Sequence, residues 1–171
     1  MNYKFEDFLL DFEYQMLAES YYVDTLSQKD LYDLFDADWE IADGFPMISY
    51  EETPDSDYHM SLQSSCFLND LSYNDNCKWV TISRVPDGIV GIMCISDNYH
   101  DSLKIEAFEV NTICRGFGYS RKILSAFESA AEENNYERIE VKPYDTQAAS
   151  YWEYMGYTKN EKGVVRYVKN I

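Results

Sequence analysis

The sequence predicts an α/β fold with a mixed central sheet. Two β-rich runs, 78–85 and 89–96, flank the turn residues Pro-Asp-Gly and predict an antiparallel hairpin. A third strand-like run follows at 103–110. An amphipathic helix is then predicted at 118–134, and its apolar face consists of Ile123, Leu124, Phe127, Ala130 and Ala131. A strand, a helix and a final strand complete the order of elements.

The first twenty residues predict an amphipathic helix. Apolar residues recur at helical spacing over 4–20, at Phe5, Phe8, Leu9, Phe12, Met16 and Leu17. The β-rich run at 21–26 then predicts a short strand.

The next fifty residues mix helix signals with turn residues. Ser27 and Asp30 resemble a capping box, and the apolar residues that follow predict a helix reaching Trp39. Residues 43–57 contain one glycine and two prolines, which predicts a loop. We expect another helix at 58–71.

The last part of the chain alternates between strand and helix patterns. The polar segment 96–102 is expected to link the hairpin to the third strand. Residues 138–144 predict a strand, and 145–155 predict a helix that ends at Gly156. Residues 164–170 then predict the final strand.

The composition is that of a globular domain. The chain has 171 residues, of which 46% are hydrophobic and 16% aromatic, enough to bury a sizeable core. No apolar run approaches the roughly 20 residues that a membrane-spanning helix needs. The first residues carry acids where a signal peptide would carry bases. We therefore expect a soluble cytoplasmic protein that does not interact with membranes.

The chain is strongly acidic. It has 31 acidic and 14 basic residues, a formal net charge of −17. Such a field repels phosphate backbones, so nucleic acid is not an expected partner. The same field would attract a cationic substrate or a basic protein, or it could serve only to keep the protein soluble.

The cysteines do not have the spacing of a metal site. Cys66, Cys77, Cys94 and Cys114 form no C-x-x-C pair, and the chain has two histidines. We therefore expect no metal, and we expect free, mostly buried thiols. Arg115 could lower the pKa of the neighbouring Cys114 thiol, although a small apolar residue at a strand end is the simpler interpretation.

The stretch R-G-F-G-Y-S at 115–120 separates a predicted strand from a predicted helix. A helix N-terminus leaves backbone N–H groups unpaired, and glycines allow a phosphate to approach them. With Arg121 and Lys122, this stretch forms the densest basic cluster of an acidic chain. It therefore predicts a phosphate-bearing ligand at the start of the helix. The alternative is that Gly116 and Gly118 only permit a tight turn.

The stretch also resembles motif A of the GNAT superfamily of acyl-CoA-dependent N-acetyltransferases, written Arg/Gln-x-x-Gly-x-Gly/Ala. Arg115, Gly118 and Ser120 take the three defining places, with serine in place of glycine or alanine. The later stretch E-V-K-P-Y-D-T-Q-A-A-S-Y-W-E-Y-M-G-Y is similar to the family's next strand and helix, with Asp145 in place of asparagine. The matching positions there are Ala148, Tyr151, Gly156 and Tyr157. The resemblance covers about 21–171.

The resemblance implies a mostly antiparallel sheet flanked by helices and splayed between the strand ending at Val110 and strand 138–144. Acetyl-CoA would be the co-substrate and would occupy this cleft. Its pantetheine arm would pair with backbone near Glu109 and Val110, and its pyrophosphate would accept hydrogen bonds from N–H groups of 115–120. The implied cofactor-binding residues are Glu109, Val110, Arg115, Gly116, Phe117, Gly118, Tyr119, Ser120, Arg121 and Asp145.

Direct acetyl transfer requires a deprotonated amine, a polarised thioester carbonyl and a protonated or stabilised leaving thiolate. The resemblance implies that the Val110 N–H polarises the carbonyl. Glu140, Glu106 or Glu109 could accept the amine proton through a water, or no dedicated base could be needed. These carboxylates could equally be solvated or salt-bridged.

The acid that protonates the thiolate is less clearly marked. The family's usual tyrosine falls at Trp152, whose indole N–H cannot be given up as a proton. Tyr151 is the nearest candidate, although one helical step of about 100° would turn it away toward the core. Solvent or a tyrosine from another segment could also serve.

The leading hypothesis is therefore an acetyl-CoA-dependent N-acetyltransferase that acts on a primary amine by direct attack in a ternary complex. The acceptor could be a metabolite, a peptide or protein amine, or an aminoglycoside. A catalytically weak or inactive CoA-binding regulatory module is the alternative, because Ser120 and Trp152 depart from the pattern. An acidic interaction protein that ignores CoA is a third interpretation.

The organisation expected from the resemblance has two parts. Residues 1–20 form an N-terminal helical extension, and 21–171 form one acyltransferase domain. Within that domain, 21–77 would supply the acceptor side and 78–171 the CoA-binding side. Dimerisation is common in the family, so a homodimer is one expected state.

Overall fold

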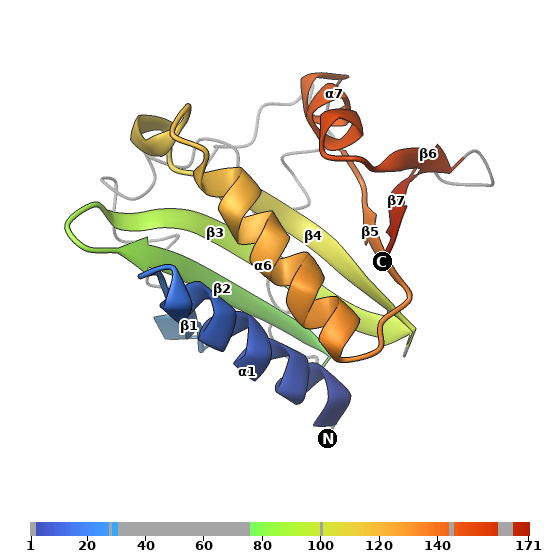
Figure 1. Ribbon diagram of the computed structural model, residues 1–171, viewed down its shortest axis with the longest axis horizontal. Helices are drawn as coiled ribbons and strands as arrows, with labels where there is room; N and C mark the ends of the chain where they lie inside the picture. The colour runs from blue at the N-terminus through green and yellow to red at the C-terminus, as the bar shows by residue number, and fades with distance from the viewer. Residues whose placement is uncertain (1–2, 28, 31–75, 100, 144–145, 161–165) are drawn as a thin grey trace.

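The computed structural model describes the chain in six segments: 3–27, 29–30, 76–99, 101–143, 146–160 and 166–171. Seven strands within these segments form one sheet in the order β1-β2-β3-β4-β5-β7-β6 (Figure 1). The pair β4–β5 is parallel, and the other neighbouring pairs are antiparallel. The expected α/β fold with a mostly antiparallel sheet is confirmed.

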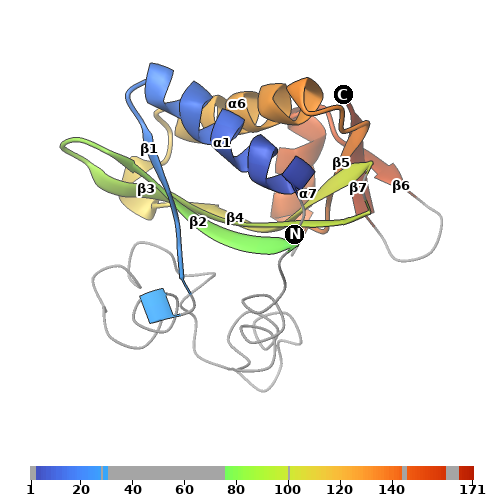
Figure 2. The ribbon, with the colours of Figure 1, turned by 90° about the horizontal axis from the view of Figure 1, so that it is seen from below.

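Helix α1 (Tyr3–Ala18) packs beside helix α6 on one face of the sheet (Figure 2). Its completely buried apolar face consists of Phe5, Phe8, Phe12 and Met16. Phe8 and Phe12 both meet Phe127 of α6 edge-on, with ring centroids 5.1 and 5.6 Å apart. The predicted helix is confirmed, and it ends before Ser20, which has a left-handed φ of 68°.

Strand β1 (Tyr22–Thr25) lies at one edge of the sheet and pairs with β2 (Cys77–Arg84). Strand β2 forms the predicted hairpin with β3 (Gly88–Tyr99). Both the short first strand and the hairpin are therefore confirmed. Core side chains alternate along β2, where Val80 and Ile82 face the helices.

The expected link at 96–102 is wrong, because most of it is strand. Strand β3 continues to Tyr99, and β4 (Ser102–Val110) begins three residues later. The polar residues of this segment have partners that allow a strand there: the Asp97 N–H donates to the Asn76 carbonyl, and the Tyr136 hydroxyl donates to the Asp97 carboxylate. Polar composition alone therefore indicated the wrong element.

The remaining elements follow the predicted order. A 3-10 turn at Thr112–Cys114 leads into α6 (Tyr119–Glu133), followed by β5 (Arg138–Val141) and α7 (Thr146–Tyr154). Strand β5 is shorter than predicted, and the proline at position 143, which cannot donate to a ladder, follows its end.

The C-terminal strands differ from the prediction in number. Strand β7 (Arg166–Asn170) confirms the predicted final strand, but β6 (Thr158–Asn160) pairs with it at the edge of the sheet and was not expected. All three β6 residues are exposed, so the strand lacks the alternation of apolar and polar residues that marks a half-buried strand.

The start of the second predicted helix is visible as a capping box. The Ser27 N–H donates to Asp30 at 2.9 Å, and the Asp30 N–H donates to the Ser27 hydroxyl at 3.2 Å. The hydrogen bonds from Ser27 lower the pKa of Asp30. The rest of that helix, the loop 43–57 and the helix 58–71 lie outside the described residues. No helix in the described segments is long and apolar enough to cross a membrane.

Candidate functional site

The sheet is split between β4 and β5. Their parallel ladder pairs Ser102–Ile105 with Arg138–Val141 and then stops, while β4 continues to Val110. Figure 1 shows the two strands diverging from their paired end, with β5 leading toward α7. The expected splayed strand pair is therefore present.

A bulge in β4 marks the beginning of the split. Cys94 of β3 pairs with Ala107 and the next residue, Ile95, pairs with Ile105, so Glu106 is an extra residue in β4. A bulge bends its strand and increases the local twist. It therefore lies where β4 turns away from β5.

The backbone of β4 beyond the bulge offers hydrogen-bonding groups to the split. The Asn111 N–H donates to the Val90 carbonyl at 2.9 Å, and hydrogen-bonded and non-hydrogen-bonded pairs alternate along an antiparallel ladder. Phe108 and Val110 therefore occupy the non-hydrogen-bonded places, and their N–H and C=O groups point away from β3. An extended ligand chain in the split could pair with them as an added strand.

The glycine turn ahead of α6 is open. Gly116 and Gly118 have left-handed φ values of 83° and 80°, and Gly118 caps the helix without a side-chain hydrogen bond. Apart from each glycine and its two chain neighbours, no described residue has an atom within 4 Å of the place where a Cβ would stand. The first helical bond runs from the Lys122 N–H to the Gly118 carbonyl, so the preceding N–H groups of this turn lack helical partners.

Arg115 lies against the end of β4. Its Nε donates to the Val110 carbonyl at 3.2 Å, and its guanidinium pairs with the Glu109 carboxylate at 3.0 Å. Glu109 is almost fully buried, and its charge is thus compensated inside the sheet. The adjacent Phe117 is 70% exposed. The arginine therefore fixes the end of the strand, and the backbone of the turn is left to receive an anion.

The other side chains of the motif attach α6 to its neighbours. The Tyr119 hydroxyl accepts from Arg84 at 2.9 Å and donates to Asp87 at 3.1 Å, both near the β2–β3 turn. Arg121 donates to the Tyr154 hydroxyl of α7 and lies over its ring. These contacts hold the N-terminus of α6 between the hairpin and α7.

Helix α7 presents a tyrosine to the same N-terminus. The Tyr151 hydroxyl is buried and makes no hydrogen bond of good geometry within the described segments, although Ser120 lies close to it. Burial raises the pKa of Tyr151 from 10.0, while Ser120 and the Arg121 charge act in the opposite direction. Trp152 is buried in the core, where the centroid of its ring lies 6.3 Å from that of Phe108.

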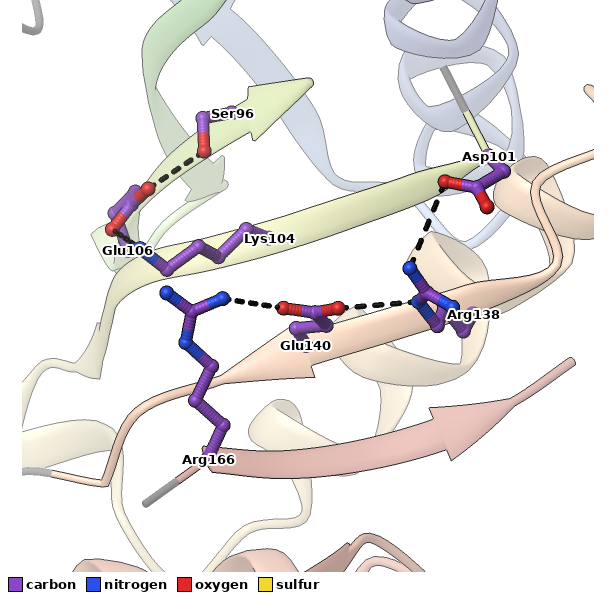
Figure 3. Close-up of polar contacts among 7 residues, drawn as sticks. All are labelled: Ser96, Asp101, Lys104, Glu106, Arg138, Glu140 and Arg166. Atoms are coloured by element: carbon purple, nitrogen blue, oxygen red, sulfur yellow. Dashed lines mark hydrogen bonds and ion pairs between the residues drawn. The ribbon is translucent and has the colours of Figure 1, made fainter. Parts of the chain in front are cut away.

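Glu106 and Glu140 both lie in ion pairs on the sheet face away from α1 and α6 (Figure 3). Glu106 accepts from the Ser96 hydroxyl at 2.7 Å and pairs with Lys104 at 2.8 Å. Glu140 pairs with Arg138 at 3.1 Å and with Arg166 at 3.0 Å. The salt-bridged state that the sequence left open is the one that forms.

This polar face extends beyond the split. A hollow of about 420 Å³ lies over β5, β6 and β7, and Arg138 and Glu140 line it. Sequence reasoning missed four partners of the two glutamates: Lys104, Arg138, Arg166 and Ser96. Successive side chains of a strand point to opposite faces of the sheet, and Lys104 of β4 lies beside Glu140 of β5. This alternation could have placed Lys104 on the same face as Glu140.

The remaining expected site features have mixed outcomes. Asp145 lies outside the described residues. Cys77, Cys94 and Cys114 are free and buried, as expected. The possibility that Arg115 activates Cys114 is wrong, because burial raises the pKa of this thiol. The described part of the chain has no group of residues that could hold a metal ion.

Comparisons with known proteins agree with this geometry. The profile of the acetyltransferase (GNAT) family matches residues 28–157, which is most of the chain. No curated protein matches it. A solved acetyltransferase from Thermus thermophilus superimposes with a TM-score of 0.61 at 15% identity, over 89% of this chain and 97% of the other.

Two more solved structures share the fold. A GNAT-family acetyltransferase from Staphylococcus aureus has a TM-score of 0.60 at 12% identity, over 88% of this chain and 98% of the other. Ard1 from Thermoplasma volcanium has a TM-score of 0.58 at 14% identity, over 89% and 98%. With the family profile, the split sheet and the open glycine turn in agreement, the chain belongs to the GNAT family of acetyltransferases.

Proposed function

We propose that the protein is an acetyl-CoA-dependent N-acetyltransferase that transfers the acetyl group to a primary amine by direct attack in a ternary complex. The observation that carries this proposal is the open turn of Gly116 and Gly118 at the N-terminus of α6, beside a split that begins after Ile105. The chain's family supplies the general chemistry of acetyl transfer.

In this proposal acetyl-CoA occupies the split. The diphosphate accepts hydrogen bonds from the unpaired N–H groups at residues 118–121, where the helix dipole favours negative charge. The pantetheine arm pairs with the outward backbone groups of Phe108 and Val110. The Val110 N–H, which points into the split, polarises the thioester carbonyl.

Glu106 is the proposed base. It lies on the bulge where the split begins, and its carboxylate is fixed by Ser96 and Lys104. A water on this carboxylate could take the proton of the attacking amine. Glu140 is the second candidate, but Arg138 and Arg166 each engage one of its oxygens.

Tyr151 is the proposed acid. Its buried hydroxyl lies near Ser120 beside the split, and its raised pKa keeps the proton in place at neutral pH. The hydroxyl has no hydrogen-bond acceptor of good geometry within the described segments, so it is able to donate to the leaving thiolate.

The acceptor is an amine that is protonated in solution at neutral pH, and the excess of acids in the chain attracts it. The attacking form is the neutral amine. Its capture as a cation and its deprotonation near Glu106 would therefore be successive steps.

The experiment compares two glycines with the same backbone conformation. Gly118→Ala places a methyl group at the proposed diphosphate site. Gly88→Ala places one in the β2–β3 turn, where φ is 75° and no other described residue has an atom within 4 Å of the new Cβ. Both changes should cost roughly 1–2 kcal/mol of stability because both force alanine into the left-handed region. Only Gly118→Ala should weaken acetyl-CoA binding in calorimetry, by roughly tenfold.

Three results would count against the proposal in different ways. No acetyl-CoA binding by the unaltered protein would reject it outright. Equal losses of affinity in the two variants would remove the glycine turn as the binding site. Binding without release of free thiol across a broad panel of amines would favour the CoA-binding regulatory module instead.

A further inference from the structure

Six charged side chains, five from β4, β5 and β7 and one from the turn before β4, form a chain on the sheet face away from α1 and α6 (Figure 3). The acids and bases alternate along most of it. From one end to the other, the order is Glu106, Lys104, Arg166, Glu140, Arg138 and Asp101.

The alternation fails at one place. Lys104 pairs with Glu106 at 2.8 Å and Arg166 pairs with Glu140 at 3.0 Å, but the two cations follow one another without an acid between them among the described residues. In Figure 3 the guanidinium of Arg166 extends toward the end of the Lys104 side chain. Two neighbouring cations repel each other, and an anion between them would relieve that repulsion.

Both cations have hydrogen-bond donors to spare. Arginine carries five N–H donors, and Arg166 makes one hydrogen bond within the described segments, to Glu140. Lysine carries three, and the described contact of Lys104 is with Glu106. Their side chains are 35% and 26% exposed, so they are held in place but can be reached.

The anion seat, defined as the space between Lys104 and Arg166, lies at the closed end of the split. Lys104 reaches Glu106, the bulge residue at which β4 leaves β5. Along β4, Phe108 and Val110 lie roughly 7 and 13 Å beyond that point at about 3.3 Å per residue. The distance between the anion and the amine of an acceptor therefore decides whether its amine reaches the thioester.

We propose that the acceptor of this enzyme is an amine that also carries a carboxylate, as amino acids do, and that the carboxylate binds between Lys104 and Arg166. This inference rests on the proposed acetyl transfer. Guanidinium and carboxylate form charge-assisted, often bidentate hydrogen bonds, which fix orientation as well as position. The ammonium end would then lie toward Glu106 and the split.

The charge of the whole molecule makes the seat specific. A chain of net charge −17 repels anions in general. A carboxylate is admitted where two cations lie side by side, and an acceptor without one leaves their remaining hydrogen-bond donors unused. The enzyme should therefore distinguish an amino acid from its amide, although the two have nearly the same size and shape.

The experiment uses the full chain with acetyl-CoA and measures release of free thiol. The acceptors are α-amino acids and the unbranched series from glycine and β-alanine to 6-aminohexanoate, each beside its primary amide. The series varies the distance between amine and carboxylate, and each amide removes the charge alone. For the best acid, we expect kcat/KM to exceed that of its amide by roughly 10- to 100-fold.

Arg166→Gln should remove most of this preference, by raising KM for the acid and leaving the amide nearly unchanged. Lys104→Gln should lower the same ratio of acid to amide, while kcat changes for both acceptors because Lys104 also pairs with Glu106. Lys78→Gln on β2 is the control, because it removes a positive charge two strands away without touching the seat. Thermal unfolding checks that each variant is folded, and Lys104→Gln tests the seat if Arg166→Gln does not fold.

The outcomes separate the two proposals. Equal rates with acids and amides, or an acid preference that survives both variants, would overturn the carboxylate seat and leave acetyl transfer intact. Acetylation of other amines but of no acid in the panel would have the same meaning. A chain that binds no acetyl-CoA would overturn both.

Discussion

The Tyr151 hydroxyl, like that of Tyr21, is buried with no well-aligned hydrogen bond in the described segments, and it lies beside the open turn of α6. Buried hydroxyls normally have partners, and an unpaired one carries a free-energy cost. A donor held ready for a ligand atom explains that cost. Its location puts the donor beside the bound co-substrate, and a variant that lacks the hydroxyl distinguishes donation to the thiolate from donation to the diphosphate.

Removal of this hydroxyl should slow the chemical step. We expect Tyr151→Phe to lower kcat by about 10²-fold with little change in the affinity for acetyl-CoA, because the ring remains and only the proton donor is lost. Burial raises the pKa of Tyr151 above 10.0, so the unaltered enzyme should keep its acid through neutral pH and lose it only above that value. Steady-state kinetics from neutral to strongly alkaline pH measure this.

Tyr167→Phe is the matched control, because it removes a phenol that bonds Glu153 away from the turn. It should leave kcat unchanged. A kcat for Tyr151→Phe equal to that of the unaltered enzyme would assign proton donation to solvent or to another tyrosine.

Substitutions of Glu106 and Glu140 should have different effects on the kinetics. Glu106→Gln keeps the size of the side chain and removes its ability to accept a proton, so kcat should fall by roughly 10²-fold at neutral pH. The loss should shrink at high pH, where the acceptor amine is already neutral. Glu140→Gln should act mainly on KM, because it frees Arg138 and Arg166. If Glu140→Gln showed the pH-dependent loss instead, Glu140 would be the base.

At the scale of elements, α1 is a main support of α6 and so of the turn at its start. Phe8 is completely buried and contacts Phe127 and Tyr136 edge-on. We expect Phe8→Ala to cost about 3–5 kcal/mol of the free energy of unfolding, measured by chemical denaturation, because loss of a large aromatic side chain leaves a cavity in a packed core.

The control lies on the opposite side of the same helix. Tyr14 is 74% exposed, and Tyr14→Ala should change the free energy of unfolding by less than about 0.5 kcal/mol. Comparable losses in the two variants would mean that helix propensity, rather than packing on α6, holds α1 in place.

Elements with a strong apolar period could be predicted from the sequence, and those without one could not. The face from Ile123 to Ala131 fixes α6, and the turn residues at 86–88 fix the hairpin. Strand β6 has no buried face, and the end of β3 carries polar residues whose partners are far along the chain. No local pattern can report a partner such as Tyr136, which lies 39 residues from Asp97.

At the scale of the whole molecule, the excess of acids should make stability depend on salt. Like charges repel in the compact state, and salt screens that repulsion. We therefore expect the thermal midpoint to rise when NaCl is increased from about 10 mM to about 150 mM, within which range the Debye length falls from about 30 to about 8 Å. Sucrose at the same osmolality is the control, because it carries no charge. It separates the screening of charge repulsion from the stabilising effect of a solute that is excluded from the protein surface. A falling midpoint would mean that the ion pairs outweigh the net repulsion.

Part of the candidate site could likewise be predicted from residues close together in the sequence, and part depends on residues that are far apart in it. Motif A is contiguous, so the open turn of Gly116 and Gly118 ahead of α6 could be predicted from a short stretch of sequence. The partners of Glu106 and Glu140 come from β3, β4, β5 and β7, and only the strand register brings them together. The direction of Tyr151 depended on how Trp152 packs against Phe108, which spacing along one helix does not reveal.

The short ladder between Ser102–Ile105 and Arg138–Val141 has a consequence for how the protein responds to its co-substrate. A pantetheine arm paired with Phe108 and Val110 would take the place of a neighbouring strand along the part of β4 that β5 does not reach. Amide hydrogen exchange at these two positions should then slow on saturation with CoA, and the C-terminal strands should open less often on their own.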